Sequence, residues 1–138
     1  MRILIAALAE YASISQPGNK LNVLGAFDTI GAHQFPVVHL QAVLALRMQF
    51  EYDDRSSRHA LAIVIVNQDG KEFAKLEGPV QTPDIEPGKR NVTNHILILQ
   101  QLRFKAPDQF SIIIKWDGEE QQRLPLDVVQ IVQAPPAG

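Results

Sequence analysis

The sequence predicts an all-β protein, a single-domain β-sandwich of about eight mainly antiparallel strands. Segments in which apolar and polar residues alternate with a period of two recur along the chain, which is typical of half-buried strands. Clusters of Gly, Pro, Asn and Asp separate these segments at intervals of roughly 8–12 residues. No segment carries a convincing helical pattern. A small barrel is the alternative arrangement of the same strands.

The first predicted strand, residues 3–11, is apolar on both faces. A single cation precedes it, so the start of the chain also resembles a weak signal peptide. Its apolar run, residues 3–9, is at the short end for a signal and too short for a membrane span. We therefore expect a buried strand here. The turn Gln16-Pro17-Gly18-Asn19 then leads to a second strand over residues 20–29.

After a loop over residues 31–36, the clearest alternation in the chain covers residues 38–52. Its even-numbered positions are all apolar: Val38, Leu40, Ala42, Leu44, Leu46, Met48, Phe50 and Tyr52. A helix is the rival interpretation, because Ala, Leu, Gln, Arg and Met favour helices. On a helix, however, these positions would wrap around the axis instead of forming a stripe. We therefore predict a strand that buries its even-numbered side.

The middle of the chain contains a hairpin and a long loop. The apolar run 60–66 and the segment 71–76 flank the turn Asn67-Gln68-Asp69-Gly70, which is a hairpin signal. Residues 79–90 contain several prolines and predict the second long loop. Residues 92–99 then make another strand, which is apolar on both faces in its second half.

The last two predicted strands form a second hairpin. Residues 110–116 are apolar at every even position and contain three consecutive isoleucines, whose β-branched side chains favour strands. Asp117-Gly118 follows at once and is a strong turn signal. The return strand, residues 119–128, contains Pro125. Because proline cannot donate to a ladder, we expect an edge position or a bulge there.

One domain accounts for the chain. Its 138 residues match the usual domain size of roughly 100–150 residues. Hydrophobic residues make up 46% of the sequence and charged residues 20%, which is an ordinary globular composition. We assign residues 1–133 to the sandwich domain and expect residues 134–138, rich in Pro and Ala, to form a flexible C-terminal tail.

Several motifs together resemble a known family. The most specific stretch runs from Lys20 through Asn22 and Gly25 to Asp28, and Glu10-Tyr11-Ala12, Phe35-Pro36, Trp116-Asp117-Gly118 and Leu124-Pro125-Leu126 accompany it. This pattern is similar to a family of small bacterial proteins known only as a domain of unknown function, with "GKLN..G.FD" as its N-terminal motif. The resemblance covers nearly the whole chain and implies an immunoglobulin-like or related sandwich. It implies no activity and no site residue.

Charge and composition exclude several function classes. Thirteen Lys and Arg residues against fifteen Asp and Glu residues give a net charge of −2, so no basic face is available for nucleic acid. We likewise expect no membrane segment. The absence of cysteine excludes disulfides, thiolate metal sites and a cysteine nucleophile. A cysteine-free chain fits a reducing compartment, and we expect a cytoplasmic protein.

Sequence motifs of enzymes and cofactor sites are not found. The chain has no glycine-rich phosphate loop, no H-E-x-x-H and no G-x-S-x-G, so we expect no catalytic activity and no cofactor. The weak candidates for a metal or small-ligand site are Asp28, His33 and His39, which surround the loop 31–36. A carboxylate with two imidazoles is a zinc or iron ligand set. We expect these residues to serve ordinary structural roles more often than to hold a metal.

The most informative feature is the apolar character of both faces of two strands. In a two-layer sandwich the outer face of a strand is normally wet. We therefore predict that an apolar outer surface carrying Leu4, Leu8, Leu97 and Leu99 is covered by a loop, by the C-terminal segment or by another subunit. The leading functional hypothesis is a non-catalytic interaction module, a homo-oligomer or a binder of a protein partner. The alternative is a small-ligand or metal-binding sandwich that uses the Asp28–His39 region.

Overall fold

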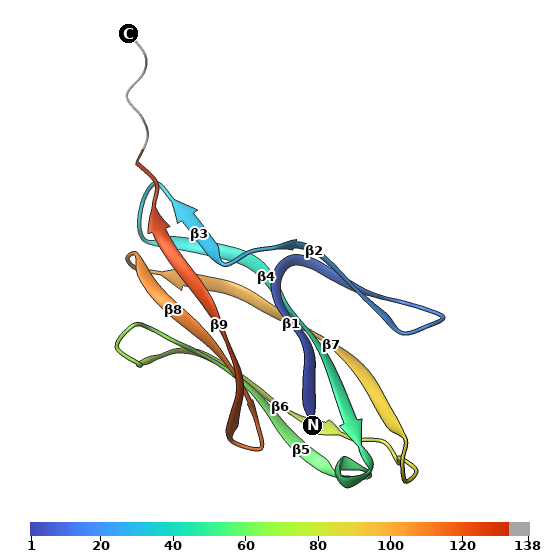
Figure 1. Cartoon of the computed structure of the whole chain (residues 1–138). Coiled ribbons are helices and arrows are strands. Elements are labelled where there is room, and N and C mark those ends of the chain that lie inside the picture. The colour runs from blue at the N-terminus through green and yellow to red at the C-terminus, as the bar shows by residue number, and fades with distance from the viewer. Residues whose placement is uncertain (133–138) are drawn as a thin grey trace.

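The computed structural model describes residues 1–132 and contains two β-sheets packed face to face (Figure 1). The strands are β1 (Arg2–Ser15), β2 (Lys20–Ala26), β3 (Thr29–Ala32), β4 (Val37–Glu51), β5 (Arg58–Val66), β6 (Glu72–Gln81), β7 (Arg90–Phe104), β8 (Asp108–Trp116) and β9 (Glu119–Gln130). One sheet has the order β2-β1-β4-β7 and the other has the order β3-β9-β8-β5-β6. This arrangement confirms the prediction of an all-β sandwich. The predicted tail, residues 134–138, lies outside the described residues.

One short helical turn, η1 (Tyr52–Asp54), interrupts the strands in the described part of the chain. Glu51 and Asp54 form a capping box around it, and the α-ammonium group of Met1 lies 3.1 Å from Asp54 Oδ1. Between residues 1 and 132, no helix has the length and apolar character needed to cross a membrane.

The short strand β3 was not expected from the sequence. It lies partly inside the predicted loop 31–36 and pairs in parallel with β9, from Thr29 opposite Asp127 to Ala32 opposite Gln130. Four residues that contain Gly31 give too short a pattern to predict a strand. Pro125 fits its expected edge position, because β3 pairs with β9 only from Asp127 onward and leaves the proline without a second neighbouring strand.

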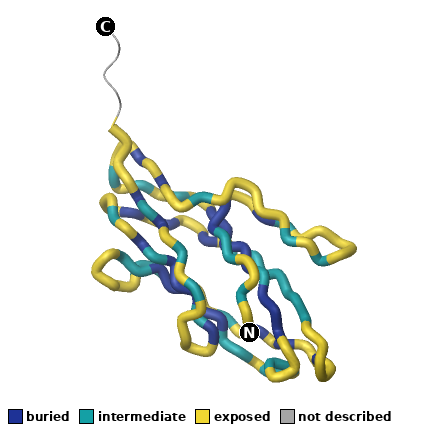
Figure 2. Tube along the Cα trace, in the orientation of Figure 1, coloured by how far each residue is buried: buried dark blue, intermediate teal, exposed yellow. Residues whose placement is uncertain are grey.

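The core lies between the two sheets. β5 and β8 pair with each other and direct alternate residues inward, with Ile63 opposite Ile114 and Ile65 opposite Ile112, all buried. The even-numbered residues of β4 from Ala42 to Phe50 face them from the other sheet. The buried parts of the chain therefore concentrate in the centres of the long strands, as Figure 2 shows.

The prediction that β4 buries its even side along its whole length is wrong at its first residues. Val38 is exposed and Leu40 is 74% exposed, whereas Val37 packs against the core. In β7, next to this part of β4, the inward-facing positions change from odd to even numbers. Leu99 faces inward before the change, and Leu102 and Phe104 face inward after it. The change coincides with Gln101, whose φ of 53° lies in the left-handed region. A local twist of this kind leaves no signal in an alternating sequence.

Part of the outer face of the four-stranded sheet is covered by the chain itself. β1 bends sharply, and its second half forms a hairpin with β2 that crosses over β4 and β7 (Figure 1). A second apolar cluster is buried under this hairpin, made of Ala9, Ala12, Val43 and Ala45, with Leu21 and Ile96 packed against it. The segment that covers this part of the face is the β1–β2 hairpin, which is not one of the three coverings that the sequence suggested.

Hydrogen bonds hold the tip of this hairpin on the sheet. The Asn19 carbonyl oxygen accepts from Arg47 Nη1 at 2.8 Å and from Asn94 Nδ2 at 3.0 Å. Asn19 Nδ2 donates in turn to the Val92 carbonyl at 2.9 Å. Asn19 has a φ of 52°, a conformation that Asn adopts more readily than most residues. The hairpin tip, β4 and β7 are thus joined by one polar network, here called the Asn19 clamp.

Candidate interaction surface

The structure corrects the predicted outer surface. Leu8 and Leu99 are buried in the core, and Leu97 packs against that core, so these three residues face inward. The reason is the register between β4 and β7, in which Leu97 lies opposite Leu44 and Leu99 opposite Ala42, both on the inward side of β4. Leu4 is exposed, next to a register shift between Ile3 and Ile5. The four leucines therefore do not form one outer surface.

The three candidate ligands Asp28, His33 and His39 have separate partners. Asp28 accepts a hydrogen bond from the Thr29 hydroxyl, and His33 Nδ1 lies 3.1 Å from the Ile131 carbonyl. The ring of His39 packs beside Phe27, with 5.7 Å between the ring centroids. Within residues 1–132, no three histidine or acidic side chains come together in an arrangement that could hold a metal ion.

A histidine–aspartate pair that the sequence did not single out lies at one end of the sandwich. His59 Nδ1 is 2.7 Å from Asp117 Oδ2, and the His59 ring stacks on Trp116 with 4.6 Å between centroids. The hydrogen bond from His59, with a second from the Ala60 amide, lowers the pKa of the Asp117 carboxyl. His59 Nε2 is buried without a partner in the described residues, so this imidazole nitrogen is closed off from solvent, whereas the Asp117 carboxylate is exposed.

The side of the sandwich between β6 and β7 is open. β6 is the last strand of one sheet and β7 is the last strand of the other, and within residues 1–132 no further strand pairs with the outer side of either. β6 carries protection against pairing with further strands. It contains Pro79 and a register shift against β5, and Lys75 and Glu77 form an ion pair at 3.2 Å on it.

β7 lacks most of these features. It is 15 residues long, contains no proline, and carries no charged side chain between Arg90 and Arg103. A long strand edge with unpaired backbone groups and few charges is a template for pairing with another strand. One carbonyl near its beginning, that of Val92, is already engaged by Asn19. The free part of the edge therefore begins after Val92.

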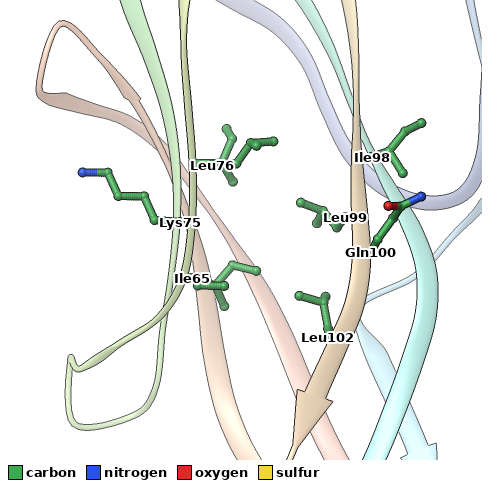
Figure 3. Close-up of a pocket in the computed structure, with 9 residues that line it drawn as sticks. Ile65, Lys75, Leu76, Ile98, Leu99, Gln100 and Leu102 are labelled. Carbon is green, nitrogen blue, oxygen red and sulfur yellow. The ribbon is translucent and has the colours of Figure 1, made fainter.

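Two apolar hollows open along the gap between these edge strands. One has a volume of about 170 Å³ and lies among Ile65, Leu76, Leu99 and Leu102. In Figure 3 these four side chains point into the gap, while Lys75, Ile98 and Gln100 point away from it. The other hollow, of about 200 Å³, shares Ile63 and Leu76 with the first and extends toward Val80 and His95. Leu76 thus forms a wall common to both hollows.

His95 is the polar residue that β7 contributes to the lining of the second hollow. It lies opposite Leu46 in the sheet register, on the inward side, and Leu97 follows it on the same side. Burial lowers the pKa of its imidazole from the ordinary value near 6.5, because desolvation disfavours the charged form. Its Nε2 atom is buried with no hydrogen-bond partner among the described residues. The folded protein is therefore most stable when His95 is neutral.

Sequence reasoning missed this surface because strand order decides it. Nothing in the alternating segment 92–99 tells whether that strand lies at the centre or at the edge of a sheet. The absence of proline and of internal charge in β7 is visible in the sequence, but a central strand would look the same.

The comparisons with known proteins give a family and no activity. A search of curated proteins gives no match to the chain. Residues 4–129 match a family described as "Family of unknown function (DUF6941)", and the protein therefore belongs to this family, as the motifs around Lys20–Asp28 led us to expect.

Proposed function

We propose that this protein is a non-catalytic interaction module that binds an extended segment of a partner protein by strand addition to the free edge of β7. In this mode the backbone of the added strand pairs with the edge, and its alternate side chains enter pockets beside that edge. The observation that carries the proposal is the combination of an edge strand that has no proline and no internal charge, and is free after Val92, with two apolar hollows along it.

The geometry of a sandwich supports this mode of binding. A strand that extends the sheet beyond β7 has its inward side chains directed toward the gap in front of β6. Those side chains would meet Leu76 and Leu99, which line the hollows. Apolar side chains would then be removed from water on both sides of the gap, and backbone hydrogen bonds would fix the register.

β7 is favoured over β6 as the pairing edge. Pro79 removes a donor from β6, and the register shift near Val66 bends its ladder with β5. An added strand beside β6 would meet these irregularities along ten residues, whereas β7 has one, at Gln101.

The proposal is tested by titrating the isotope-labelled protein with a soluble probe peptide whose core alternates valine and threonine. We expect amide chemical-shift changes that concentrate on β7 between His95 and Arg103 and on the walls of the hollows. No binding, or shift changes confined to other strands, would overturn the proposal.

A matched pair of variants separates the hollows from general surface effects. Leu76→Glu places a charge in the wall shared by both hollows, at a side chain that is 40% exposed, so the fold tolerates it. We expect it to weaken peptide binding about tenfold or more, since the charge loses water on binding. Leu24→Glu makes the same change at an exposed site on β2 and should leave binding unchanged. Equal effects of both variants would contradict the account.

A further inference from the structure

The two ends of β7 carry cations and no anion. Lys89 and Arg90 lie at its beginning, and Arg103 and Lys105 lie at its end, and all four are exposed. No acidic residue occurs between Lys89 and Lys105 in the sequence. The rest of the stretch is neutral and rich in Ile and Leu. The free edge is therefore an uncharged strand with a positive charge at each end.

These cations are not neutralised within the described residues. None of the four takes part in an ion pair within 4.0 Å in the part of the chain from residue 1 to 132. Glu51 is the register partner of Arg90 on β4, but no ion pair joins them. The positive ends of β7 contrast with a chain whose net charge is −2.

This charge pattern disfavours a second copy of the chain as the added strand. Full-length antiparallel pairing of β7 with itself would place Lys89 opposite Lys105 of the second copy. In this register Arg90 lies opposite Phe104 and Arg103 opposite Asn91, so the cations at the beginning of one strand gather near those at the end of the other. Like charges opposite each other across a strand pair are destabilising. A parallel pairing in register would likewise bring each cation beside its own equivalent.

We propose that the segment bound along β7 belongs to a different protein and has an alternating apolar core with acidic residues on both sides. This inference rests on the proposed function and names the chemistry of its partner. Arg90 and Arg103 are thirteen positions apart, which corresponds to roughly 43 Å along an extended strand. A partner segment of about the same length places one acidic cluster at each positive end, so complementarity selects the partner and fixes its position.

Three peptides with one valine–threonine core test this inference. They carry two Glu, two Ser or two Lys residues at each end. We expect the Glu-flanked peptide to bind about tenfold more tightly than the Ser-flanked peptide at low salt, and the Lys-flanked peptide to bind most weakly. The advantage should shrink as the salt concentration rises, because these charges are exposed.

A charge reversal identifies the residues responsible. Arg103→Glu should remove most of the preference for the Glu-flanked peptide and improve binding of the Lys-flanked peptide. Arg123→Glu is the control, because Arg123 is an exposed cation on the other sheet whose pair with Glu120 is a surface contact of small energy. The control should keep the wild-type order of the three peptides. Melting temperatures of both variants establish that they are folded.

The outcomes separate the two proposals. Equal affinity of the three peptides, with shift changes still on β7, would overturn the acidic-flank inference and leave strand addition standing. No binding of any peptide at β7 would overturn the proposed function itself. A dimer in analytical ultracentrifugation that the Glu-flanked peptide dissociates would make a second copy the occupant and would overturn the inference.

Discussion

Two apolar regions border the four-stranded sheet, and the chain covers one of them and leaves the other open. The outer face around Val43 and Ala45 is covered by the β1–β2 hairpin, which the Asn19 clamp holds in place. The gap between β6 and β7 remains open, with two apolar hollows and a free strand edge. An apolar surface therefore indicates a partner only after the chain's own segments have been placed. Once the β1–β2 hairpin is taken into account, the candidate interaction surface is the open side between β6 and β7 and not the outer face of the sheet.

The largest expected effect comes from a charge placed under the hairpin. Ala45 is fully buried in the cluster between the sheet and the hairpin, so Ala45→Glu should lower the free energy of unfolding by about 3–5 kcal/mol. Ile98 points to the same side of the same sheet but is 52% exposed, and Ile98→Glu should stay within about 0.5 kcal/mol of the wild type. Urea unfolding measures both. Similar losses of unfolding free energy in the two variants would contradict the conclusion that the hairpin covers Ala45 and leaves Ile98 exposed.

A smaller effect is expected at the tip of the hairpin. Asn19→Ala removes the hydrogen bonds of the side chain to Val92 and Asn94 and disfavours the left-handed backbone, so we expect a loss of about 1–3 kcal/mol. Asn19→Gly removes the same bonds but accepts the backbone conformation, and it should be the less destabilised of the two. Urea unfolding gives the order, and a glycine variant less stable than the alanine variant would argue against the role of the backbone conformation.

The smallest predicted effect is a pH dependence at the open side. The pKa of His95 is lower in the folded protein than its ordinary value near 6.5, so between these two values the unfolded chain binds more protons. The contribution of neutral, buried His95 to the free energy of unfolding is therefore fully present above pH 6.5 and is lost as the pH falls toward the pKa of His95 in the folded protein. His95→Leu should reduce this loss, while the same change at the exposed His33 should not. An unchanged pH profile in His95→Leu would contradict the assignment.

Much of the fold could be predicted from local sequence, because it rests on alternation and turns. The Asp117-Gly118 hairpin and the inward even positions of β8 follow directly from their residues. The change of side in β4 and β7 could not be predicted, because it arises from backbone twist near Gln101. The parallel strand β3 is too short to carry a pattern of its own.

The sequence could predict that the protein has an apolar surface, but it could not predict which residues form it. The excess of apolar residues in β1 and β7 correctly indicated that something covers one face, but Leu97 and Leu99 were assigned to the wrong side. Two consecutive apolar pairs, Ile96-Leu97 and Ile98-Leu99, give no signal of which members face inward. The register with β4 decides this, and register is a property of the assembled sheet.

The most direct test of strand addition is amide hydrogen exchange, measured residue by residue, with and without the Glu-flanked peptide. In an antiparallel or parallel ladder, alternate residues of the edge strand donate to the new neighbour. We therefore predict that alternate amides of β7 between His95 and Arg103 gain protection on binding, while those of β6 change little. Unchanged exchange along β7 at saturating peptide, or protection gained on β6 instead, would contradict the account.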